Sequence, residues 1–175
     1  TYSIGMSHYG LQVLYDVMNR RADWACERAF TPLGDMEQLL RTHGLPLFSL
    51  ETFTPLGEFD VLGFSLQYDL GCTNVLTILE LSGIPLSAEE RTLADPLVIA
   101  GGPCVSNPEP MARFIDLFVV GDGEKPLAEL IELVRRARNA GASRQEMIVE
   151  AARTIIRLAR NLGISYLTLF AFSEE

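Results

Sequence analysis

Three short hydrophobic runs without polar alternation each lead into a glycine-containing turn. They read FDVLGFSL (Phe59–Leu66), LVIAGGP (Leu97–Pro103) and LFVVGDGE (Leu117–Glu124), and the last two turn sharply. Such runs predict strands buried on both faces, because a half-exposed strand would alternate apolar and polar residues. A glycine directly after a strand permits a tight turn, or lets a ligand approach the backbone.

Stretches with helical periodicity separate these runs. Helices are predicted at Leu11–Asn19, Met36–His43, Asn74–Leu81 and Pro126–Asn139, and a Ser143–Glu146 capping box starts another that runs to about Asn161. Strands are predicted at Trp24–Phe30, Phe59–Leu66, Leu97–Ala100, Leu117–Val120 and Ile164–Phe172, whereas Thr1–Tyr9 is predicted to be a loop. The alternation predicts an α/β fold with a parallel sheet, whose ligand site lies beyond the carboxyl ends of the strands.

Length and composition indicate one folded domain, residues 1–175. The chain has 175 residues, of which 48% are hydrophobic and 21% charged, and it shows no internal repeat or linker. No apolar run approaches the roughly 20 residues of a membrane helix, and no signal peptide is visible. We therefore expect a chain without membrane contact.

Net charge and cysteine content bear on the binding partners and on the cellular location of the protein. A net charge of -9 argues against a nucleic-acid partner, since phosphate binding needs clustered Lys and Arg. The three cysteines are widely spaced and odd in number, which disfavours a disulfide framework and indicates a cytoplasmic location.

The glycine turns are the best binding candidates. Gly101–Gly102–Pro103 and Gly121–Glu124 follow successive strands and lead into helices, so they present backbone N–H groups to a ligand. Ser65–Tyr68 ends the preceding strand and is expected beside them. Neither turn matches the dinucleotide fingerprint or a Walker loop.

No catalytic or metal site is predicted. Cys26, Cys72 and Cys104 form no C-x-x-C pair, and His8 and His43 have no partner, so a surface or capping role is expected for both histidines. Cys104 remains open between a small buried residue and a nucleophile at a helix start. Without catalytic pairs, the chain is predicted not to be an enzyme.

Several segments resemble a known family. The segments IGMSHYGLQVLYDVMNRR, FDVLGFSLQYDLGCTNVLTILELSGIP, PLVIAGGPCVSNPEP and FIDLFVVGDGEKPLAELIELV are similar, in order, to the N-terminal cobalamin-binding-type domain of B12-dependent radical SAM proteins. The resemblance covers about residues 2–150. It implies a Rossmann-like, flavodoxin-like parallel sheet of about five strands with helices on both faces. It also implies a non-catalytic domain that holds a corrin for a partner radical SAM catalytic domain.

By position, the resemblance assigns the corrin-facing residues to four loops. These are Met6, Ser7 and His8; Ser65, Leu66, Gln67 and Tyr68; Gly101, Gly102, Pro103 and Cys104; and Gly121, Asp122, Gly123 and Glu124. Two motifs are missing. The cobalt-ligand motif D-x-H-x-x-G fails around His8, because Met6 and Leu11 stand at its Asp and Gly positions, so binding without a histidine ligand is expected. C-x-x-x-C-x-x-C is also absent, so no iron–sulfur cluster is expected in this chain.

The end of the chain resembles something else. The segment 151–175 does not resemble the radical SAM family. Within it, residues 157–175 are similar to a helix and strand of cis-prenyltransferases of the undecaprenyl diphosphate synthase type, but the aspartate motif of those enzymes is absent. Members of the first family begin with a strand that this sequence lacks. We therefore expect Ile164–Phe172 to fill the central position of the sheet, parallel to its neighbours. A strand swap into a homodimer is the rival, and the alternative function is an engineered or recombined chimeric scaffold without ligand.

Overall fold

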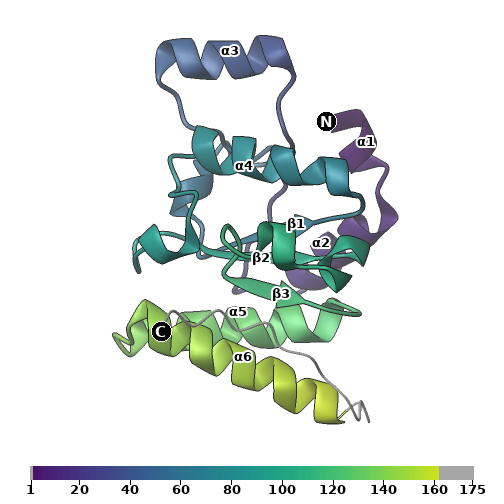
Figure 1. Ribbon diagram of the computed structural model, residues 1–175, viewed down its shortest axis with the longest axis vertical. Helices are drawn as coiled ribbons and strands as arrows, with labels where there is room; N and C mark the ends of the chain where they lie inside the picture. The colour runs from purple at the N-terminus through teal and green to yellow at the C-terminus, as the bar shows by residue number, and fades with distance from the viewer. Residues whose placement is uncertain (1, 162–175) are drawn as a thin grey trace.

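The computed structural model describes residues 2–161 as an α/β arrangement built on a parallel sheet. The helices are α1 (Tyr2–Met6), α2 (Tyr9–Asn19), α3 (Gly34–His43), α4 (Cys72–Leu81), α5 (Glu124–Asn139) and α6 (Arg144–Asn161), and the strands are β1 (Val61–Ser65), β2 (Leu97–Gly101) and β3 (Leu117–Val119). Figure 1 shows layers in the order α3, α4, sheet, α5 and α6. The sequence-based prediction of a parallel sheet with helices on both faces is confirmed.

The sheet has the order β1-β2-β3, with β2 in the centre. Val61 pairs with Leu97, and Ile99 pairs with Leu117, in parallel register. Residues Leu97–Ala100 of β2 are buried, as expected for an unbroken apolar run.

Each face of β2 packs against a different set of helices. Val98 and Ala100 contact Val75 and Leu79 of α4, together with the turns that connect β2 to β3. Leu97 and Ile99 contact Leu130, Leu133 and Val134 of α5 and Met147 and Ala151 of α6. The two apolar stripes of one strand therefore hold both helical layers.

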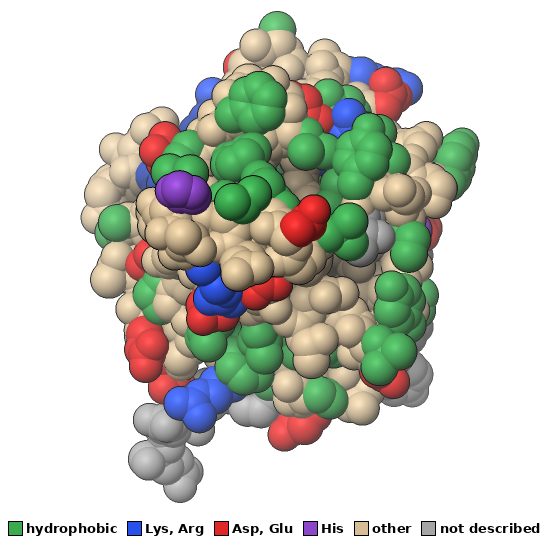
Figure 2. Space-filling model, turned by 90° about the horizontal axis from the view of Figure 1, so that it is seen from above, with side chains coloured by type: hydrophobic (Ala, Val, Ile, Leu, Met, Phe, Trp, Pro, Cys, Tyr) green, Lys and Arg blue, Asp and Glu red, His purple; other side chains and the backbone are tan. Residues whose placement is uncertain are grey.

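Helix α3 packs on the outer side of α4, away from the sheet. Leu40 is buried against Leu47, Leu56, Ile78 and Leu81. Figure 2 looks onto this layer and shows hydrophobic side chains at its surface, where Leu33, Leu39 and Leu45 are exposed. Gly44 ends α3 in the left-handed conformation, directly after the predicted helix end at His43.

A buried ion network joins segments at the amino ends of the strands. Asp116 Oδ2 accepts hydrogen bonds from Arg91 Nη1 at 3.1 Å, Arg144 Nη2 at 2.7 Å and the Val98 amide at 2.7 Å. Arg144 also donates to the carbonyl oxygens of Thr92 and Pro96. The segment before β2 is thereby tied to β3 and α6. No role was predicted from the sequence for Asp116, Arg91 or Arg144.

Two sequence-based expectations are wrong. Residues 2–161 contain three strands rather than the four that were expected within that range, because Trp24–Phe30 forms no strand. A strand needs a row of backbone hydrogen bonds to a neighbouring strand, and Trp24–Phe30 lies next to none of β1, β2 and β3 in the sheet order. Its backbone is instead held by separate hydrogen bonds, such as the one from the Leu50 amide to the Arg28 carbonyl. The N-terminal segment forms the short helix α1 rather than a loop.

Three further expectations concern the start of α6, the last predicted strand and membrane-spanning helices. The capping box is confirmed: the Ser143 amide and hydroxyl donate to Glu146 Oε2, and the Glu146 amide donates back to Ser143 Oγ. The expected strand Ile164–Phe172 lies outside the described residues. Between residues 2 and 161, no helix combines the length and the apolar character that crossing a membrane requires.

Candidate functional site

Three predicted loops meet at the carboxyl edge of the sheet. β1 ends at Ser65, β2 at Gly101 and β3 at Val119, and these positions lie in parallel register. The loops Ser65–Tyr68, Gly101–Cys104 and Gly121–Glu124 therefore leave the sheet side by side. This is the edge at which open α/β sheets bind ligands.

The first two loops are bonded to each other. The Leu66 amide donates to the Gly101 carbonyl at 2.8 Å, and the Cys104 amide donates to the Leu66 carbonyl at 3.1 Å. Gly102 has φ of 104°, and a Cβ at this position would lie 2.7 Å from the Leu66 carbonyl oxygen. Gly102 is therefore required by the contact between the loops as well as by its own backbone conformation.

The third loop is open on one side. Gly121 has φ of 99°, and nothing lies within 4 Å of the Cβ it would carry. Gly123 approaches α2, since its Cβ would lie 3.6 Å from Leu14 Cδ2. The turn thus leaves an uncovered stretch of backbone at Gly121 and is supported by α2 at Gly123.

The N-terminal loop, Met6–His8, leads into α2. His8 Nδ1 accepts a hydrogen bond of 3.0 Å from the Leu11 amide, so His8 caps this helix and the predicted capping role is confirmed. Ser7 Oγ donates to the Ile4 carbonyl, and Gln12 Nε2 donates to the Met6 carbonyl. It is α2, rather than the loop itself, that approaches the strand-end loops, since Leu14 Cδ2 would lie 3.6 Å from a Cβ on Gly123.

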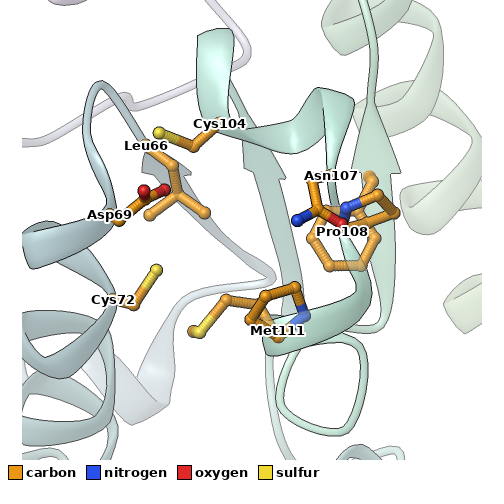
Figure 3. Close-up of a pocket in the computed structure, with 9 residues that line it drawn as sticks. Leu66, Asp69, Cys72, Cys104, Asn107, Pro108 and Met111 are labelled. Carbon is orange, nitrogen blue, oxygen red and sulfur yellow. The ribbon is translucent and has the colours of Figure 1, made fainter.

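A cavity of about 150 Å³ lies between the first two loops and the start of α4. Its lining comprises Leu66, Asp69, Cys72, Cys104, Asn107, Pro108, Pro110, Met111 and Phe118. Figure 3 shows Asp69 and Cys72, from the turn that leads into α4, and Cys104, from the turn after β2, facing the cavity. Leu66 and Cys104 were predicted as site residues from the sequence, whereas Asp69 and Cys72 were not. Both lie just after the predicted loop Ser65–Tyr68, so a longer predicted loop would have contained them.

The surroundings of Cys104 favour its protonated thiol over the thiolate. Burial raises the pKa of Cys104, and a hydrogen bond to Asp69 and the negative charge of that carboxylate raise it further. A nucleophilic cysteine needs the opposite shift, toward the thiolate. The geometry therefore favours the interpretation of Cys104 as a packing residue.

Exposed apolar side chains surround the strand ends. Tyr68 is 52% exposed, Leu70 81% and Val120 62%. Apolar side chains held in water beside glycine turns suit a ligand or partner with an apolar face. Among the residues described, no group of three or more His, Cys, Asp or Glu side chains is placed to hold a metal ion.

The chain is similar to a known protein family. A family model described as "Radical SAM proteins, N-terminal" matches residues 10–156, which include the three strands and the strand-end loops. No curated protein and no solved structure matches the chain.

Proposed function

Because the chain belongs to the family of N-terminal domains of radical SAM proteins, we propose that it is a non-catalytic domain that holds a corrin, as cobalamin, at the carboxyl ends of β1, β2 and β3. The observation that carries the proposal is the convergence of the three strand-end loops on one edge of a parallel sheet.

The residues at this edge fit a flat macrocycle. The open backbone at Gly121 lets a ring approach without meeting a side chain. The exposed Tyr68, Leu70 and Val120 offer apolar contacts to a ring face. The cavity of about 150 Å³ is too small for such a ring, so the open edge, rather than the cavity, is the proposed binding surface.

The proposal assigns roles to the predicted loops. Ser65–Tyr68, Gly101–Cys104 and Gly121–Glu124 would hold the corrin, with Met6–His8 at the side of α2. When bound, cobalamin would supply a reactive cobalt centre to a radical SAM catalytic domain, the proposed partner. The proposal includes no histidine ligand to cobalt, because the D-x-H-x-x-G motif fails around His8, whose Nδ1 caps α2.

Retention of the corrin chromophore tests the proposal. The protein is mixed with hydroxocobalamin and passed through a gel-filtration column, and the visible spectrum of the protein peak is recorded. We expect retention by the wild type and loss of retention by Val120→Glu, because a carboxylate beside the ring face would be desolvated on binding.

Leu39→Glu is the matched control. Leu39 is 55% exposed on α3, outside the strand-end edge, so this variant should retain the chromophore. Wild-type protein that elutes without colour, or equal retention by Val120→Glu, would overturn the proposal. The alternative, a scaffold without ligand, predicts that colourless outcome.

A further inference from the structure

We propose that a groove beneath α1 binds a neutral ligand bearing a carboxamide group. The groove has a volume of about 350 Å³ and is lined by Tyr2, Met6, Arg28, Leu50 and Glu51. This volume falls within the range of small-molecule sites, roughly 300–1,000 Å³. Its lining combines apolar walls with one cation and one anion, which is the composition of a site that orients a polar group.

The cation of the groove is held in a fixed position. Arg28 Nε donates to Glu51 Oε1 at 2.7 Å, and the Arg28 amide donates to Glu51 Oε2 at 2.8 Å. The guanidinium carbon lies 4.3 Å from the centre of the Tyr15 ring, as in a cation–π contact. Both side chains of the ion pair are 22% exposed. Since Nε is engaged by Glu51, the terminal nitrogens of Arg28 are the donors that remain for a ligand.

The Arg28–Glu51 ion pair favours a ligand without net charge. Glu51 compensates the charge of Arg28 and would repel a carboxylate or phosphate, whereas Arg28 would repel an amine. A carboxamide satisfies both partners, because its carbonyl accepts from Arg28 while its N–H donates to Glu51. Tyr2, Met6 and Leu50 supply apolar contact to the rest of the molecule.

Two sources share this chemistry: a free small carboxamide, and a carboxamide arm of a bound corrin. Met6 belongs both to the groove and to the proposed corrin-facing loop Met6–His8. Only the second source rests on the proposed function.

Nicotinamide, a planar aromatic carboxamide, is the probe, with nicotinate as its charged counterpart. Titration calorimetry on the wild-type protein should give a Kd on the order of 1 mM for nicotinamide, the range open to so small a ligand, and at least about tenfold weaker binding of nicotinate. Arg28→Lys should weaken nicotinamide binding about tenfold, since a lysine cannot reproduce the guanidinium geometry.

Glu51→Gln supplies a readout that loss of structure would not mimic. Removing the carboxylate leaves Arg28 uncompensated, so this variant should prefer nicotinate over nicotinamide. Glu58→Gln, an exposed residue outside the groove, should behave as the wild type. Circular dichroism establishes that each variant is folded.

The outcomes separate the two proposals. Nicotinamide binding without cobalamin retention leaves the groove inference standing and overturns the corrin proposal. Cobalamin retention without nicotinamide binding, or nicotinate binding as tight as nicotinamide in the wild type, overturns the groove inference.

Discussion

The thiol of Cys104 lies beside the carboxylate of Asp69, in a cavity that also receives Cys72. Burial and the neighbouring carboxylate both favour the neutral thiol, so the thiolate fraction at any given pH is smaller than for a free cysteine. Asp69 therefore adds to the effect of burial in lowering the reactivity of Cys104 toward electrophiles.

We expect Asp69→Asn to lower the pKa of Cys104 toward the ordinary thiol value of about 8.5. More thiolate would then be present at neutral and mildly alkaline pH, and alkylation by iodoacetamide should become several-fold faster there. The measurement is the alkylation rate of the Cys104 peptide against pH, read by mass spectrometry. Cys26 in the same sample is the control, because burial rather than Asp69 raises the pKa of its thiol.

An unchanged rate at Cys104 would show that the carboxylate does not control the thiol. Fast, stoichiometric alkylation of the wild type at neutral pH would instead revive the nucleophile interpretation.

Cys104 could be predicted as a site residue from the sequence, but its contact with Asp69 could not. Cys104 is visible because it follows a strand-end glycine pair. Asp69 belongs to the turn after a different strand, and the two meet because β1 and β2 pair in register and their loops are hydrogen-bonded. Spacing along the chain carries no information about this contact.

Among the elements, the turn after β2 is the most constrained of the strand-end connections. Gly102 combines a left-handed φ of 104° with a close approach to the Leu66 carbonyl. Any side chain here meets both a conformational cost and a steric one. The junction of the first two loops thus depends on the absence of a Cβ.

We expect Gly102→Ala to lower the free energy of unfolding by at least about 1–3 kcal/mol, the cost of a strained backbone conformation. Urea denaturation measures the change. Gly34→Ala at the start of α3 is the matched control, since nothing lies within 4 Å of its Cβ and its φ is not left-handed. That control should be neutral or slightly stabilising. Equal stability of both variants would refute the proposed clash at Gly102.

Helices with capping signals were predictable, whereas a strand without a neighbour was not. The Ser143–Glu146 box and Gly44 mark helix ends through local hydrogen bonds and backbone conformation, which the sequence encodes directly. Trp24–Phe30 has the composition of a strand, but strand formation needs a pairing partner, and composition does not provide one. For the same reason, residues 2–161 contain three strands instead of the four expected within that range.

Across the whole molecule, the network at Asp116 joins distant parts of the chain. The side chains of Asp116 and Arg91 are fully buried, and that of Arg144 is 9% exposed. Arg91 also donates to the carbonyl oxygens of Pro85, Leu86 and Phe114. One carboxylate therefore compensates two guanidinium groups that hold the segment before β2, the start of β3 and the start of α6 together.

We expect Asp116→Asn to destabilise the protein by about 3–5 kcal/mol, because it leaves buried guanidinium charge without its counter-ion. Urea denaturation provides the measurement. Asp16→Asn removes an exposed ion pair with Arg20 and should cost less than about 1 kcal/mol. A similar cost for both variants would show that the buried network contributes no more than a surface pair.

The Asp116 network lies at the amino ends of the strands, opposite the glycine turns. The buried anchoring network and the proposed binding surface therefore lie at opposite ends of the strands. Substitutions at the exposed positions Tyr68, Leu70 and Val120 would change the proposed binding surface without touching the Asp116 network, whereas Gly102 is fixed by its contact with the Leu66 carbonyl. If the proposed surface binds a ligand, its specificity could change without compensating mutations at the anchoring network, and the exposed positions of the turns would be the place to graft new binding properties.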